Sequence, residues 1–112
     1  MRLDKERLED IFEAIENIER HLPATSDEFH GNELVRVWCL RRLEIIGEAA
    51  ANLSQDVRDQ SPNVPWKQII GMRNTLIHAY FDINLDIVWD TVTSNLPPLI
   101  AELEKLLAED DD

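Results

Sequence analysis

The segment 33–53, with the sequence ELVRVWCLRRLEIIGEAAANL, decides the fold. It reads as one long helix whose apolar residues occupy two sides: Val35, Trp38, Cys39, Ile45, Ile46, Ala49, Ala50 and Leu53 on one, and Leu34, Leu40 and Leu43 on another. A helix that is apolar on more than one side packs between neighbours instead of lying on the surface. We therefore expect it to be the most buried helix. Gly47 and the small residues at 49–51 would let a neighbouring helix approach it closely.

Helical periodicity continues towards the N-terminus. A stripe of apolar residues at three- and four-residue steps predicts an amphipathic helix over about 4–22, which Pro23 ends. The stripe consists of Leu8, Ile11, Phe12, Ile15, Ile18 and Leu22. The sequence Thr25-Ser-Asp-Glu28 matches a capping box and opens a short turn, after which Asn32 is placed to cap the helix that begins at Glu33.

Towards the C-terminus, residues 54–59 predict a short turn, and Pro65 starts a third long helix. Gly71 lies within that helix and would again permit close contact with a neighbour. A last helical region begins near Leu85 and is interrupted by Pro97-Pro98, which should kink or restart it. No segment alternates polar and apolar residues in the way a strand does, so the predicted fold class is all-α.

The length of 112 residues predicts a single domain over 1–108, followed by an acidic segment, 109–112. We expect that segment to fray, because negative charge at a helix C-terminus opposes the macrodipole. There is no N-terminal signal core and no apolar run long enough for a membrane span, which predicts a cytoplasmic protein with no membrane contact. Cys39 is the only cysteine, which excludes an intramolecular disulfide, and its apolar neighbours place it in the core.

Charge is unevenly distributed along the chain. The formal net charge of -12 would repel nucleic acid if it were evenly spread. The segment 36–73 instead holds six basic and four acidic residues, a net charge of +2, so the remainder carries -14. The basic residues are Arg36, Arg41, Arg42, Arg58, Lys67 and Arg73. They favour a polyanion only if they converge on one site, since otherwise they are solvated helix faces with local ion pairs.

The stretch Arg73-Asn-Thr-Leu-Ile-His-Ala-Tyr80 combines a guanidinium, an imidazole and a phenol within about two helical turns. Arg73 can neutralise a phosphate with paired N–H donors, and His78 can accept or donate a proton near neutral pH. Asn74, one turn before His78, can orient the imidazole or donate to a phosphate oxygen, and Tyr80 adds a hydroxyl at the mouth of the site. The set requires no metal and no cofactor. Spacing alone, however, favours a plainer interpretation in which His78 is packed or exposed without chemistry.

Other residues carry weaker predictions. Glu48 could pair with Arg73 or with Arg42 and support the geometry of a cleft, or it could simply lie on the surface. A metal–carboxylate bundle is disfavoured, because the chain lacks the Glu-x-x-His pairs that such sites use. The apolar helical neighbours of the three tryptophans predict core or dimer-interface anchors with no chemistry; these are Trp38, Trp66 and Trp89.

Three stretches resemble the HepT-like family, a branch of the HEPN superfamily whose members include the toxins of HepT/MntA-type toxin–antitoxin systems. They are RRLEIIGEAA at 41–50, VPWKQIIGMRNTLIHAYF at 64–81 and LDIVW at 85–89. The resemblance runs from the first helix to the LPPL segment at 96–99, and the order and spacing of its motifs are specific. It implies a HEPN-type up-and-down antiparallel helical bundle with a Pro-kinked last helix. It also implies a homodimer in which the R-x4-H-x-Y helices of two subunits meet at a cleft.

The same resemblance implies a function. The chain would be the toxin of a toxin–antitoxin system, a metal-independent endoribonuclease with Arg73 and His78 as its catalytic pair and RNA as its substrate. Tyr80 would be the residue to which a cognate minimal nucleotidyltransferase antitoxin transfers AMP, which silences the toxin. The alternative is a non-catalytic module whose cleft binds a nucleotide or the nucleotidyltransferase itself.

Overall fold

The computed structural model describes residues 2–78 and 84–110, and in those ranges it contains helices and connecting turns but no strand. This confirms the predicted all-α class. The elements are α1 (Arg2–His21), α2 (Ser26–Gly31), α3 (Glu33–Ala51), α4 (Gln55–Gln60), α5 (Trp66–His78), α6 (Leu85–Asp90), the π-helical turn η2 (Thr91–Asn95) and α7 (Leu96–Asp110). None of the described helices is long and apolar enough to cross a membrane.

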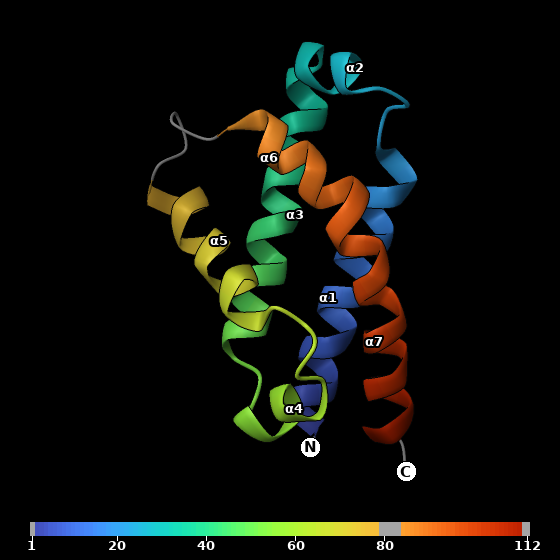
Figure 1. The fold of residues 1–112 in the computed structure, drawn as a ribbon, viewed down its shortest axis with the longest axis vertical. Coiled ribbons are helices and arrows are strands. Elements are labelled where there is room, and N and C mark those ends of the chain that lie inside the picture. The colour runs from blue at the N-terminus through green and yellow to red at the C-terminus, as the bar shows by residue number, and fades with distance from the viewer. Residues whose placement is uncertain (1, 79–83, 111–112) are drawn as a thin grey trace.

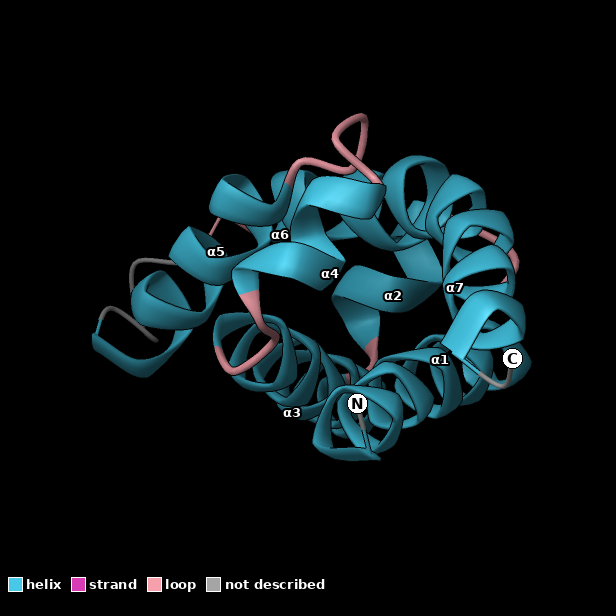
Figure 2. Ribbon diagram, turned by 90° about the horizontal axis from the view of Figure 1, so that it is seen from below, coloured by secondary structure: helices cyan, strands magenta, loops and turns pink. Residues whose placement is uncertain are grey.

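The four long helices run alternately up and down, and α3 lies between α1 and α5 (Figure 1). α7 packs on the other side of α1, while the short helices α2 and α6 cover one end of the bundle and α4 covers the other. Seen along the bundle, the helices form a ring around the core (Figure 2). The antiparallel bundle expected from the family resemblance is therefore present.

The core confirms the helical periodicity. Leu8, Ile11, Ile15 and Ile18 of α1 are each exposed by 1% or less. In α3 the buried residues include Cys39, Leu40, Leu43, Ile46 and Ala50, so the helix is buried on two sides as predicted. The tryptophans also belong to the core, because Trp66 is buried and Trp38 and Trp89 pack partly buried against it.

Side chains that accept from backbone N–H groups set the ends of the helices. Thr25 Oγ1 accepts from Glu28 N at 3.1 Å and Asn32 Oδ1 accepts from Val35 N at 3.2 Å, as the sequence predicts. The carboxylate of Asp4, buried at 4% exposure, accepts from Ser54 N at 2.9 Å and from Ser54 Oγ at 2.8 Å. Because Ser54 Oγ in turn caps α4, this contact fixes the start of α1 against α4.

The last helical region is interrupted before its prolines, at η2. The N–H of Leu96 donates to Thr91 O, five residues back, in place of the usual four. Pro97 and Pro98 follow in the first turn of α7, where a missing N–H costs little because it has no helical partner anyway. The prolines thus restart the helix after an irregular turn. α7 continues to Asp110, and residues 111 and 112 lie outside the described part.

Candidate active site

The helices α3 and α5 approach closely at Gly47. A Cβ atom added to Gly47 would lie 2.5 Å from Cβ of Arg73, 3.3 Å from its Cα and 3.2 Å from Ile69 O. Only glycine is compatible with this contact, which confirms the expectation for Gly47. The corresponding expectation for Gly71 is wrong, because Gly71 faces outward and nothing lies within 4 Å of a Cβ added there.

This close approach places Arg73 beside Glu48, one residue after the glycine. Arg73 Nη1 and Glu48 Oε2 are 2.9 Å apart, and the Arg73 side chain is 25% exposed against 61% for Glu48. Of the two partners considered for Glu48, the structure therefore selects Arg73. Arg42 instead stacks its guanidinium over the ring of Trp38, 4.7 Å from the centroid.

Two asparagines complete the network around this ion pair. Asn74 Oδ1 accepts from Arg73 Nη2 at 2.9 Å and from Nε at 3.2 Å. On the other side, Asn52 Nδ2 donates to Glu48 O at 2.8 Å. The guanidinium is thus held from two helices, by a carboxylate of α3 and an amide of α5. Asn52 was not identified from the sequence as part of the site. Its position, one turn after Glu48 and just beyond the end of the helix, could have indicated that its side chain bonds to Glu48.

The remaining predicted residues lie at or beyond the end of α5. The backbone of α5 is helical to His78, which places His78 one turn after Asn74. The side chain of His78 and the whole of Tyr80 lie outside the described residues.

Arg73 also lines a groove of about 280 Å³ between α1, α3 and α5. Its charged lining residues are Arg7 and Asp10 from α1, Arg41, Glu44 and Glu48 from α3, and Arg73 from α5. Arg41 Nη1 pairs with Glu44 Oε2 at 3.1 Å. From the sequence, the basic residues of 36–73 were expected to favour a polyanion only if they converge on one site. Two of them, Arg41 and Arg73, line this groove together with Arg7.

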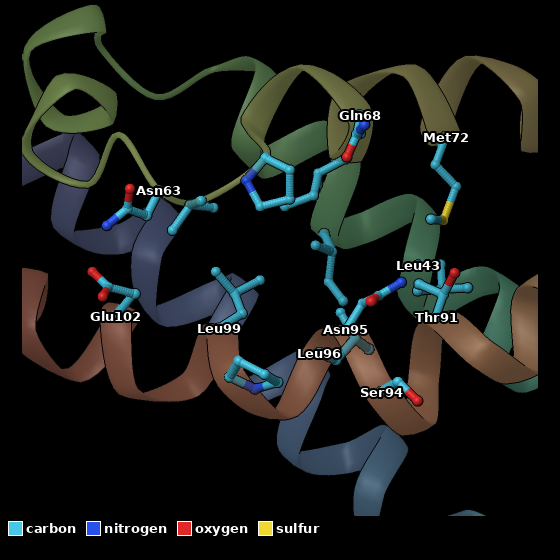
Figure 3. Close-up of a pocket in the computed structure, with 15 residues that line it drawn as sticks. Leu43, Asn63, Gln68, Met72, Thr91, Ser94, Asn95, Leu96, Leu99 and Glu102 are labelled. Atoms are coloured by element: carbon cyan, nitrogen blue, oxygen red, sulfur yellow. The ribbon is translucent and has the colours of Figure 1, made fainter.

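A larger cavity of about 430 Å³ lies elsewhere, between α5 and α7 (Figure 3). It is lined by apolar residues from three helices: Ile69 and Met72 of α5, Leu96 and Leu99 of α7, and Leu43 of α3. Neither Arg73 nor Asn74 lines this cavity. The largely apolar cavity and the charged groove that carries Arg73 share no lining residue, although α3 and α5 contribute to both.

Other chemically reactive groups do not assemble a second centre in the described residues. Burial raises the pKa of the Cys39 thiol to about 11, so the thiol stays protonated near neutral pH and is a poor nucleophile. Among the side chains of residues 3–74 and 84–108, no three from His, Cys, Asp or Glu are grouped in a way that could hold a metal ion.

Comparison with known proteins gives the family. The family model described as "Ribonuclease HepT-like" matches residues 11–106, nearly the whole chain. The chain belongs to the HepT-like ribonuclease family. This membership supports a ribonuclease role and agrees with the bundle described above.

Relatives of this HepT-like chain carry ribonuclease names. "Probable ribonuclease HepT" of Thermococcus cleftensis is 40% identical over 94% of this chain and 96% of its own length. "Putative RNase MJ1380" of Methanocaldococcus jannaschii is 44% identical over 70% of this chain and 72% of its own. "Putative RNase TTE0752" of Caldanaerobacter subterraneus subsp. tengcongensis is 38% identical over 83% of each chain. No solved structure gave a significant match.

Proposed function

We propose that this HepT-like protein is a metal-independent endoribonuclease in which Arg73 and His78 are the catalytic pair. The observation that carries the proposal is the way the Arg73 guanidinium is fixed between Glu48 and Asn74. An arginine that served only as a solvated surface charge would need neither partner. Ordering a guanidinium in advance is what electrostatic stabilisation of a reacting phosphate requires.

Helical geometry supports cooperation between Arg73 and His78. Residues five apart on a helix are separated by about 140° around its axis, and Asn74 lies between the two positions at about 100° from Arg73. Because the guanidinium bonds to the Asn74 side chain, it is drawn around the helix towards the sector in which His78 follows. One phosphate can then lie within reach of both residues.

The proposed reaction uses the 2'-hydroxyl of the RNA as nucleophile. Its oxygen attacks the adjacent phosphorus, the bond from phosphorus to the 5'-oxygen breaks, and a 2',3'-cyclic phosphate and a 5'-hydroxyl result. His78 takes the proton from the 2'-hydroxyl or supplies one to the 5'-oxygen, and Arg73 stabilises the negative charge on the phosphorane. A histidine and an arginine suffice for these steps, so no metal ion or cofactor is invoked. DNA, which lacks the nucleophile, is resistant.

We further propose that the protein acts as the toxin of a toxin–antitoxin pair in the cytoplasm, as a homodimer with two such sites facing one cleft. A cognate nucleotidyltransferase antitoxin would transfer AMP to Tyr80, two residues after His78. The added phosphodiester brings negative charge and bulk to the site, which would repel and block the RNA phosphate without any refolding. The position of Tyr80 in the sequence, two residues after the proposed catalytic histidine, and the family resemblance support this regulation.

The central test is cleavage of RNA by the unmodified protein in the presence of EDTA. We expect cleavage to persist, and His78→Ala to reduce the rate by about 10²–10⁴-fold. Arg73→Ala should reduce it by roughly 10²–10³-fold. His21→Ala is the matched control, since His21 is an exposed histidine at the end of α1 and should be dispensable.

Three results would contradict the proposal. If EDTA abolishes cleavage, metal independence is wrong. If His78→Ala cuts as fast as the parent, His78 is not catalytic and the mechanism is wrong. If the unmodified protein leaves RNA intact, the protein is instead a module that binds a nucleotide or the nucleotidyltransferase. The overall charge of -12 is the observation that favours this second function. For the regulation, co-expression with a cognate nucleotidyltransferase should add whole AMP units to the intact mass, and Tyr80→Phe should prevent the addition.

A further inference from the structure

The groove that Arg73 lines contains more cationic groups than one scissile phosphate needs. Arg7 from α1 and Arg41 from α3 line it together with Arg73 from α5, so three helices each contribute one guanidinium. Arginine is the residue best suited to bind phosphate, because its planar fork presents several donors at once. The three arginines line one depression, and one of them is the candidate catalytic arginine.

These arginines are paired to different degrees. Arg73 bonds to Glu48, and Arg41 contacts Glu44 through Nη1 alone. Arg7 is half-buried and forms no ion pair or hydrogen bond with any side chain that the structure describes, those of residues 3–74 and 84–108. A partly buried cation without an anion is a position at which an anionic ligand gains energy on binding.

The groove also differs from the rest of the surface in charge. Its lining has three arginines and three carboxylates, Asp10, Glu44 and Glu48, so its formal charge is zero in a chain of net charge -12. Two of those carboxylates are already neutralised by the arginines that they hold. A polyanion that must reach Arg73 therefore meets less repulsion along this groove than over the acidic surface around it.

We propose that this groove binds the RNA backbone next to the cut, with Arg7 and Arg41 as subsites for phosphates neighbouring the scissile one. The inference rests on the proposed ribonuclease function and extends it to the substrate: a single strand of several nucleotides instead of an isolated phosphodiester. Arg41 keeps its contact to Glu44 when a phosphate binds, because the guanidinium has further donors. Arg7 supplies the unneutralised charge.

The first experiment compares substrates of different length. A dinucleotide offers only the scissile phosphate, whereas a single-stranded RNA of twelve nucleotides also offers its neighbours. In Arg7→Ala/Arg41→Ala, we expect kcat/KM to fall by roughly tenfold or more on the longer RNA through a higher KM, and to stay within about twofold on the dinucleotide. Arg20→Ala, which removes an exposed arginine at the end of α1, is the matched control and should change neither value.

The second experiment needs no cleavage. A 2'-O-methyl oligonucleotide of the same sequence is titrated against the full chain at several NaCl concentrations. Each lost phosphate contact should lower the slope of log Kd against log salt by about 0.7 for a single strand. Asp10→Asn removes the one carboxylate in the groove that has no ion pair within the described residues, so it should strengthen binding where Arg7→Ala weakens it.

The outcomes separate the two proposals. If the parent cuts no RNA but the slopes change as stated, the ribonuclease function fails and the groove stands as an RNA site. If cleavage occurs and the double variant loses activity equally on both substrates, the arginines act on Arg73 and not on RNA, and the inference is overturned. It is also overturned if slopes and KM are unchanged. Loss of self-association or of nucleotidyltransferase binding with unchanged RNA affinity would assign the groove to a protein partner instead.

Discussion

Replacing Gly47 by alanine should lower the rate of RNA cleavage strongly while lowering the free energy of unfolding only slightly. The new Cβ would lie 2.5 Å from Cβ of Arg73, whereas carbon atoms in contact prefer about 3.5 Å or more. α5 must therefore move by about 1 Å at Arg73, or the Arg73 backbone must shift by a similar amount. Overpacking of this kind costs about 1–3 kcal/mol, and the higher helix propensity of alanine returns about 1 kcal/mol. The net loss in the free energy of unfolding should thus be about 0–2 kcal/mol.

Activity should respond far more strongly, because a displacement of about 1 Å in a positioning group can cost roughly 100-fold in rate. RNA cleavage and urea denaturation of Gly47→Ala would be measured side by side, and the rate corrected for the folded fraction. The matched control is Gly71→Ala, whose Cβ meets nothing within 4 Å. It should be more stable by about 0.5–1 kcal/mol and fully active. The reasoning is refuted if Gly47→Ala cleaves at the parent's rate, or if Gly71→Ala is impaired to the same extent.

Two further predictions concern stability and reactivity. Asp4→Ala leaves both donors of Ser54 without their buried acceptor, so urea denaturation should show that the free energy of unfolding falls by about 2–3 kcal/mol. The control Asp10→Ala, at the exposed surface, should lower it by at most about 0.5 kcal/mol. Equal losses in the two variants would show that the contact between Asp4 and Ser54 does not matter. Because burial raises the pKa of Cys39 from 9.0 to about 11, the folded state disfavours the thiolate, so stability should be full below pH 9 and fall as the pH rises towards 11. Alkylation by iodoacetamide at pH 8 should accordingly require unfolding, and rapid labelling of the native protein would contradict the assignment of Cys39 to the core.

Much of the fold was predictable because it depends on local pattern. Apolar spacing located the long helices, and Asn32 caps α3 as its side chain suggested. The short turns predicted after Thr25 and at 54–59 are wrong in kind, because both segments form six-residue helices, α2 and α4, which Thr25 and Ser54 cap. η2 was not predictable in this way. The prolines signalled an interruption, but a π-helical turn is a change of hydrogen-bond register whose position depends on how α6 and α7 pack, and the apolar pattern does not encode it.

The candidate site, too, was predictable where it depends on local sequence and not where it depends on packing. Arg73, Asn74 and His78 stand out because they are close in sequence. The choice between Arg73 and Arg42 as the partner of Glu48 depends on how α3 and α5 cross, and so does the difference between Gly47 and Gly71. Both glycines are helical, and only the packing shows which of them faces a neighbour. Arg7 could not be selected at all, since nothing in its own segment links it to residues more than sixty positions away.

The wide turn at η2 holds one residue more than a regular helix needs at this point. A π-helical turn accommodates one residue more than an α-helical turn, so removal of a single residue from 91–95 would convert it into a regular α-helical turn and leave α7 in nearly the same orientation. Leu99, Leu103 and Leu106 would then stay in the interior, whereas a single-residue deletion early in α7 itself would rotate the residues beyond it by about 100° and turn these leucines outward. A single-codon deletion within 91–95 should consequently be tolerated far better than one early in α7.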